Sequence, residues 1–167
     1  MKTEETVLEL KHPLTKDIRM YCFVCTGNTC RSPMAAALLN DLGQSRGIFA
    51  FSRGTAVTPG APIAENAAAA LRAAGVEPAG RNDYTRHRAA QLTREDFEMC
   101  DGVFALTPAH AQQILFAFPE YAGRVRILGD IADPYGGTLE QYAACLEEIR
   151  GALRALFPYL FDGDAKS

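Results

Sequence analysis

Short apolar runs alternate along this chain with longer stretches in which apolar residues recur every three or four positions. Apolar runs of four to eight residues, bounded by glycine or polar residues, are typical of buried strands. Four such runs lie at residues 18–25, 47–54, 101–107 and 124–132. The pattern predicts four strands, the first of which ends at Cys25.

The segments between these runs carry helix signals. In the segment 32–47, Pro33 stands at the first helical position and Gly47 just past the end, which favours a helix capped by Ser32. Further helices are expected at 62–74, shortly after the polar stretch 81–96, and from Pro108 to near Pro119.

The last helix has the clearest signature. Thr138 and Gln141 have the spacing of a capping box, in which each side chain bonds the backbone of the other residue. An apolar stripe follows, made of Leu139, Tyr142, Leu146, Ile149, Leu153 and Leu156. This spacing places the stripe on one helix face, so we expect it to belong to the core.

Strands that alternate with helices predict a parallel sheet with helices on both faces. The expected fold is an α/β, three-layer α/β/α sandwich of the flavodoxin-like or Rossmann-like kind. In such folds ligands bind at the carboxyl ends of the strands, where the segment after Cys25 would lie. We expect one domain over residues 20–167, preceded by an N-terminal extension at 1–19.

Charge and composition narrow the function classes. The 17 Lys and Arg are scattered among 20 acidic residues, and the formal net charge is −3, so no basic block would track a nucleic acid. No apolar run reaches the roughly 18 to 20 residues that span a bilayer, and the N-terminus lacks a signal-peptide core. Five cysteines, mostly in apolar settings, favour free thiols in a reducing compartment. We expect a cytoplasmic monomer or weak homodimer with no nucleic-acid or membrane partner.

The turn between Cys25 and Arg31 is the candidate site. It consists of Thr26, Gly27, Asn28, Thr29 and Cys30. Small and polar residues let the backbone wrap tightly at a helix N-terminus, so that several amide N–H groups point inward and bind an anion. The guanidinium of Arg31 would hold two phosphate oxygens. The same field lowers the pKa of a cysteine thiol, so Cys25 is the expected nucleophile, and Ser32 would cap the helix or donate to its thiolate.

The positions of the cysteines argue against a redox pair and against a zinc site. Cys22 and Cys25 form a C-x-x-C pair, but Cys22 lies within an apolar strand and is expected in the core rather than in a redox pair. A zinc site lacks a second Cys or His pair at ligand spacing. Cys100 and Cys145 are expected to be buried structural residues.

Transfer of a phosphoryl group to a thiolate also needs an acid for the leaving group. Asp130 and Asp133 both follow the fourth predicted strand. Asp133 precedes a proline, which keeps its backbone extended, so it is the better candidate. The alternative, that Asp133 only begins a turn, is equally compatible with the spacing.

The motif "VCTGNTCRSPMA", followed about a hundred residues later by "DPYGG", resembles the low-molecular-weight protein phosphatases. The resemblance covers residues 20–157. It implies a four-stranded parallel sheet, phosphorylated protein substrates, no metal and no cofactor. It also implies that Cys25 forms a cysteinyl-phosphate, that Arg31 holds the phosphoryl oxygens, and that Asp133 acts as acid and then as base.

In this family the loop asparagine is held by polar side chains. The resemblance therefore implies that Asn28 is structural, with Ser52 and His87 as its partners. For His87 an exposed position in the segment "TRHRAA" remains an equal alternative.

Two departures within the family concern the substrate. Thr29 stands where relatives specialised for phosphotyrosine usually carry isoleucine and where relatives resembling bacterial protein-arginine phosphatases carry threonine. Gly136 and Gly137 replace a second aromatic residue, so Tyr135 would form one wall alone. A cavity floor made polar by Thr29 suits a substrate with a guanidinium group better than a substrate with a flat apolar ring. Asp133 could also form an ion pair with that guanidinium. We therefore favour phosphoarginine over phosphotyrosine.

Two alternatives come from other classes. A thioredoxin-coupled arsenate reductase would need two further relay cysteines, and Cys100 has no second cysteine nearby in the chain. A phosphate-binding module without turnover would not need Cys25, Arg31 and Asp133 together. Cys30 could form a reversible disulfide that protects Cys25 from over-oxidation, or it could be a small buried side chain.

Overall fold

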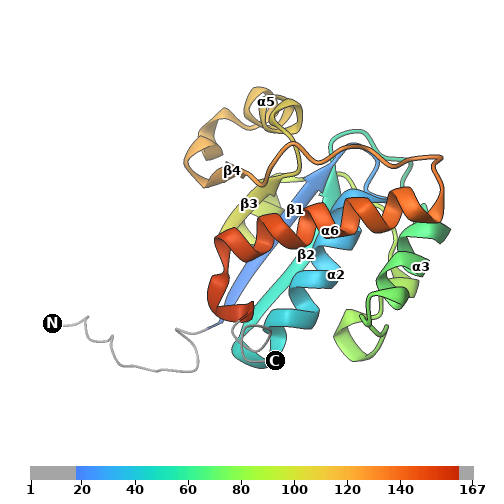
Figure 1. Ribbon diagram of the computed structural model, residues 1–167. Coiled ribbons are helices and arrows are strands. Elements are labelled where there is room, and N and C mark those ends of the chain that lie inside the picture. Colours follow the sequence, from blue (N-terminus) through green and yellow to red (C-terminus); the bar gives the residue numbers. More distant parts are fainter. Residues whose placement is uncertain (1–17, 162–167) are drawn as a thin grey trace, which may run out of the picture.

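The structure is a computed structural model that describes residues 18–161. Four parallel strands form one sheet in the order β2-β1-β3-β4. The strands are β1 (Arg19–Cys25), β2 (Ile48–Gly54), β3 (Gly102–Ala105) and β4 (Val125–Ile127). The helices are α2 (Arg31–Gly43), α3 (Glu65–Ala73), α4 (Arg94–Met99), α5 (Pro108–Ala117) and α6 (Leu139–Leu156). The predicted α/β fold with a four-stranded parallel sheet is confirmed (Figure 1).

The helices form layers on the two faces of the sheet. Side chains of β1 alternate between the layers: Phe23 joins a core with α2, α3 and α6, while Val24 joins a second core with α4 and α5. The result is the expected three-layer sandwich, in which α2 and α6 lie over one face of the strands (Figure 1). Because β1 lies between β2 and β3, its carboxyl end stands at the centre of the sheet.

Two helices start at positions that differ from the prediction. Helix α2 begins at Arg31, so Pro33 is its third residue and Ser32 lies within its first turn rather than capping it. The carbonyl of Cys30 already accepts the amide of Met34, which starts the helical bonding two residues early. Helix α3 begins at Glu65 instead of Pro62, because the amide of Ala64 bonds the carbonyl of Thr29 and holds this segment extended.

The last helix was predicted with its cap. Thr138 accepts from the amide of Gln141 at 3.2 Å, and Gln141 accepts from the amide of Thr138 at 2.8 Å, so the capping box is confirmed. The middle of the apolar stripe is buried, whereas Leu139 and Leu156 at its ends are 41% and 38% exposed. The stripe therefore belongs to the core over its central turns only.

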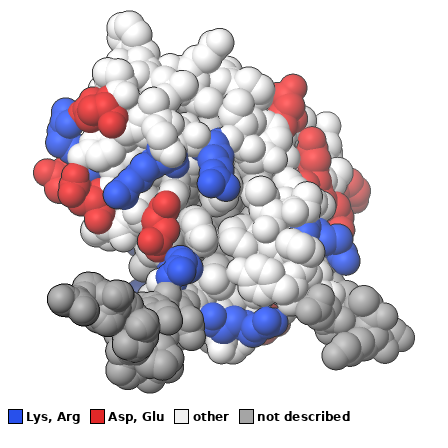
Figure 2. Space-filling view, turned by 90° about the vertical axis from the view of Figure 1, so that its left-hand side faces the viewer, with Lys and Arg blue, Asp and Glu red and all other residues white. Residues whose placement is uncertain are grey.

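The start of the first strand and the charges on the surface can be compared with the expectations from the sequence. Arg19 of the predicted extension is the first residue of β1, and residues 1–17 lie outside the described residues. Within residues 18–161 no helix combines the length and apolar character needed to cross a membrane. Figure 2 shows basic and acidic side chains interspersed on the face at the left of Figure 1. The described residues thus form no single-sign patch on this face.

Candidate active site

The turn after β1 wraps into a compact loop, and several of its carbonyl groups bond the neighbouring segments. The carbonyls of Cys25 and Thr26 accept from the amides of Thr55 and Ala56, each at 2.9 Å. The carbonyl of Thr29 accepts from Ala64 at 2.9 Å. Gly54 at the end of β2 permits this approach, because a Cβ there would lie 2.5 Å from the carbonyl oxygen of Thr26. The neighbouring strand therefore needs glycine at this position.

The amide N–H groups of the loop, unlike several of its carbonyl groups, have no partners within residues 18–161. Within the described part of the chain, no residue accepts a hydrogen bond from the N–H groups of residues 26–30. Buried or partly buried amides are nearly always paired in folded proteins, so a run of unpaired donors calls for an acceptor from outside the chain. Their position at the N-terminus of α2 favours an anion.

Asn28 fixes the shape of the loop. It is fully buried and has a positive φ of 60°, a conformation that asparagine tolerates better than most residues. Its side-chain amide donates to Ser32 and Ser52, each at 2.9 Å, and its side-chain oxygen accepts from the amide of Ala90. The carbonyl of Asn28 lies 2.7 Å from Nε2 of His87. Ser52 and His87 thus both contact Asn28, and His87 is only partly exposed.

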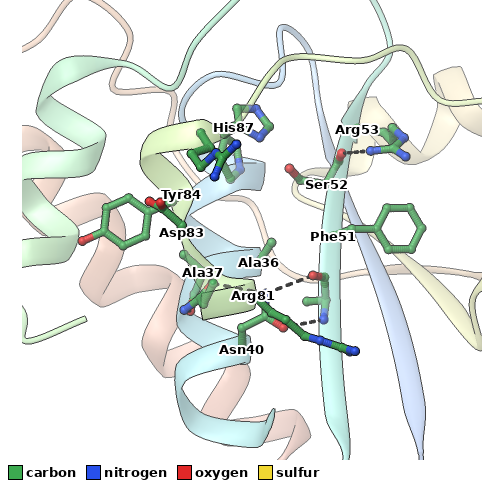
Figure 3. A pocket seen from close by; sticks show the side chains of 14 residues that line it. Ala36, Ala37, Asn40, Phe51, Ser52, Arg53, Arg81, Asp83, Tyr84 and His87 are labelled. Atoms are coloured by element: carbon green, nitrogen blue, oxygen red, sulfur yellow. Dashed lines mark hydrogen bonds between the residues drawn. The ribbon is translucent and has the colours of Figure 1, made fainter. Parts of the chain in front are cut away.

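The tautomer of His87 follows from this contact. A carbonyl oxygen can only accept, so Nε2 of His87 carries the proton and donates to Asn28. Burial lowers the pKa of His87 below its ordinary value, although the bond to Asn28 acts in the opposite direction. Figure 3 shows Ser52 on β2 and His87 on the facing segment, around a cavity of about 210 Å³. The supports of Asn28 therefore come from α2, from β2 and from the segment of His87 and Ala90.

Cys25 lies at the base of the loop and is 3% exposed. Its Sγ is 3.0 Å from the hydroxyl of Ser32. Because Ser32 accepts from Asn28, its own hydroxyl hydrogen is available either to Cys25 or to the carbonyl of Arg53 at 3.3 Å. The serine can therefore stabilise negative charge on Cys25, the second of the two roles predicted for it.

Arg31 reaches across the loop to the segment after β4. Its Nη1 donates to the carbonyl of Ile131 at 3.0 Å, and its Nη2 lies 3.6 Å from Oδ2 of Asp133. The side chain is almost entirely buried, yet Nε has no hydrogen-bond partner among the described residues. An unpaired donor on a buried cation is costly unless a ligand accepts from it.

Asp133 stands on the opposite wall. Its side chain is 56% exposed, and Oδ1 accepts from the amide of Tyr135 at 3.1 Å, which closes a turn. Asp133 thus begins a turn and also lies beside Arg31. The cavity between these elements measures about 240 Å³. Its lining consists of Cys25, Thr26, Gly27, Thr29, Cys30, Arg31, Asp133 and Tyr135, all predicted as site residues.

The remaining cysteines lie in the core. Cys22 belongs to the core on the opposite face of the sheet from Cys25, since residues three apart in a strand point to opposite sides. The two thiols therefore cannot act as a C-x-x-C pair. Burial raises the pKa of Cys30, whose Sγ lies 3.3 Å from the hydroxyl of Tyr142. A protective disulfide between Cys25 and Cys30 remains a prediction.

Two contacts of the loop were not predicted. Tyr142 of α6 meets Cys30, although the sequence assigned it only to the core. His110 of α5 lies 2.9 Å from the hydroxyl of Thr26. Each contact joins residues about a hundred positions apart, 112 and 84 respectively. The only local signal was the position of His110 three residues after the helix cap Thr107.

Comparisons with known proteins show the family of this chain. The family model described as low molecular weight phosphotyrosine protein phosphatase matches residues 20–165. A protein-arginine-phosphatase of Geobacillus stearothermophilus is 39% identical over 135 residues, covering 76% of this chain and 86% of the relative. A probable low molecular weight protein-tyrosine-phosphatase, EpsP of Ralstonia nicotianae, is 34% identical over 146 residues, covering 84% and 95%.

A solved structure gives the same result at the level of the fold. A mutant YwlE arginine phosphatase with a phosphorylated active site serine aligns with a TM-score of 0.75 and 32% identity, covering 84% of this chain and 95% of the other. The family match, the sequence identities and the structural alignment each cover most of this chain. The chain is an enzyme of the low molecular weight phosphotyrosine protein phosphatase family.

Proposed function

We propose that this phosphatase hydrolyses phosphorylated protein side chains through a cysteinyl-phosphate intermediate and that it favours phosphoarginine over phosphotyrosine. One observation carries the first part. The amides of residues 26–30 and Nε of Arg31 have no hydrogen-bond partner among the described residues, and all of these residues except Asn28 line the cavity together with Cys25. A phosphoryl group would supply acceptors to all of these donors and place its phosphorus near Sγ.

The reaction proceeds in two displacements. In the first, the Cys25 thiolate attacks phosphorus, the bond to the leaving atom breaks, and the protonated carboxyl of Asp133 gives its proton to that atom. In the second, the Asp133 carboxylate takes a proton from water, the oxygen attacks phosphorus, and the S–P bond breaks. Inorganic phosphate and the thiolate result. Arg31 stabilises the charge on the equatorial oxygens in both steps.

The relatives support both the intermediate and the class of substrate. The aligned YwlE mutant is named as carrying a phosphorylated active site serine, which is the species expected when the nucleophile is replaced by a hydroxyl. The named substrates of the relatives include arginine and tyrosine side chains. The family alone therefore does not decide between them.

Three features of the cavity favour phosphoarginine. Thr29 lies in its lining and adds a hydroxyl to the cavity wall, whereas isoleucine at this position would be wholly apolar. A second aromatic wall is disfavoured at both glycines, because a Cβ at position 137 would lie 2.8 Å from the carbonyl oxygen of Pro134 and Gly136 has a positive φ of 75°. The carboxyl group of Asp133 is 56% exposed, so a substrate guanidinium could approach it from the solvent side.

The test compares kcat/KM on a phosphoarginine peptide and a phosphotyrosine peptide of matched sequence. The parent should prefer phosphoarginine, and Thr29→Ile should shift the ratio toward phosphotyrosine by at least about tenfold, because the added bulk and lost hydroxyl disfavour the guanidinium. Thr29→Val is the matched control, since it removes the hydroxyl at nearly constant volume. A strong preference of the parent for phosphotyrosine, unchanged in Thr29→Ile, would establish the tyrosine alternative.

A second prediction addresses the acid. Asp133→Asn keeps an oxygen that can accept from the amide of Tyr135, so the turn should persist. Loss of the proton donor should lower kcat/KM by about 10² to 10³-fold on phenyl phosphate but less than about tenfold on dinitrophenyl phosphate, whose leaving group needs no proton. Equal losses on both esters would assign Asp133 to substrate binding alone.

A further inference from the structure

His110 is a buried titratable residue that the proposed mechanism does not use. It lies in the first turn of α5 and is 4% exposed. Both ring nitrogens have partners: Nδ1 lies 3.0 Å from the hydroxyl of Thr107, and Nε2 lies 2.9 Å from the hydroxyl of Thr26. The ring therefore links a helix cap on α5 to the residue that follows Cys25.

The hydrogen bonds at Thr107 decide which ring nitrogen carries the proton. The hydroxyl oxygen of Thr107 accepts from the amide of His110 at 3.2 Å, as expected of a helix cap. Thr107 is itself buried, and no acceptor other than Nδ1 is present for its hydroxyl hydrogen among the described residues. A proton on Nδ1 would leave that hydrogen unpaired, which is unfavourable. Nδ1 is thus the acceptor, and Nε2 carries the proton.

The protonated Nε2 also decides which group donates in the hydrogen bond between His110 and Thr26. Nε2–H donates to the oxygen of Thr26, so the hydroxyl hydrogen of Thr26 must point away from the ring. Thr26 is exposed and lines the cavity with Cys25 and Arg31. Burial, with a further contribution from the cation of Arg31, lowers the pKa of His110 to about 4. The ring therefore stays neutral near pH 7, and the order of donors does not reverse.

We propose that His110 is a positioning residue that orients the Thr26 hydroxyl to donate a hydrogen bond to a phosphoryl oxygen of the substrate. This inference rests on the proposed function and adds a side-chain donor to the loop amides. The donor chain runs from Thr107 through His110 to Thr26. Its use is geometric, since the ring neither gains nor loses a proton during the reaction.

The first test is spectroscopic and needs no turnover. Long-range ¹H–¹⁵N correlations of the full chain, saturated with inorganic phosphate at about pH 7, report which nitrogen of His110 is protonated. We expect a proton on Nε2 and none on Nδ1. A proton on Nδ1 would overturn the proposal, because Thr26 would then donate to the ring.

The second test uses a matched pair of substitutions. In His110→Gln the side-chain amide can reach the position of Nε2 and donate to Thr26. In His110→Asn the shorter side chain reaches Thr107 but not Thr26. His110→Asn and Thr26→Val should each lower kcat/KM about tenfold to a hundredfold, which is the loss expected for one hydrogen bond to a charged group. His110→Gln should recover most of the activity.

The double variant separates positioning from folding. If His110 acts through the hydroxyl, His110→Asn should cause no further loss in the Thr26→Val background. An equal further loss there, or equal activities of His110→Asn and His110→Gln, would reduce the histidine to a structural role and overturn the proposal. If the parent hydrolyses no phosphorylated substrate, the proposed function fails, whereas the spectroscopic result still decides the orientation of Thr26.

Discussion

Replacing Cys25 by serine is expected to lower kcat on p-nitrophenyl phosphate by at least about 10⁴-fold. A neutral hydroxyl is a far weaker nucleophile than a thiolate, and the loop stabilises an anion at this position rather than deprotonating an alcohol. Serine nearly matches cysteine in size, and the loop amides do not depend on it. Calorimetry should therefore show that inorganic phosphate still binds Cys25→Ser with an affinity within about tenfold of the parent.

Cys100→Ala is the control for this substitution. Cys100 is also buried, but it belongs to the core on the other face of the sheet. Its removal should leave kcat within about twofold of the parent in the folded protein. Undiminished hydrolysis by Cys25→Ser would contradict the nucleophilic mechanism, whereas loss of phosphate binding would point to a collapsed loop.

Replacing Arg31 by lysine is expected to lower kcat/KM by about 10³-fold although the charge is kept. The buried guanidinium bonds Ile131 through Nη1 while its buried Nε has no partner among the described residues, so it can bond the protein and a ligand at once, which a single ammonium cannot do. The loss should appear in kcat as well as in KM, because the fork acts on charge that develops in the transition state. Steady-state kinetics on p-nitrophenyl phosphate measure both.

Arg124→Lys provides the matched comparison. Arg124 also donates to backbone carbonyls, including that of Cys100 at 2.9 Å, but it lies between α4 and β4 and not in the cavity. Thermal melting should show a smaller loss of stability than in Arg31→Lys, because Arg124 is exposed and Arg31 is buried, and kcat/KM should stay close to the parent. Equal kinetic losses in the two variants would mean that Arg31 acts through stability alone.

The order of the elements could be predicted because each depends on local patterns. The apolar run of β1, the capping box of α6 and the proline that opens α5 are features of adjacent residues, and all are present as predicted. The predicted starts of α2 and α3 were wrong by two and three residues, respectively. In both cases a backbone hydrogen bond of the loop, to Cys30 or Thr29, decides where helical bonding begins.

The site residues also divide into those with a local sequence signal and those that depend on distant contacts. The lining of the cavity was predicted from two short motifs, one around Cys25 and one around Asp133. The contacts of His110 and Tyr142 with the loop were not predicted, because no local sequence pattern identifies the distant residues that these side chains contact. A histidine near a helix cap is compatible with many environments.

The sequence by itself therefore determined the alternation of strands and helices, the cradle-forming turn and the pairing of Cys25 with Arg31 on that turn. These features depend on backbone preferences over a few residues. Only the tertiary structure decided that Asp133 stands beside Arg31, that the loop amides remain unpaired, and that His110 holds Thr26. Such contacts depend on how the two cores pack against the sheet, and the free energy of that packing is shared by residues throughout the chain.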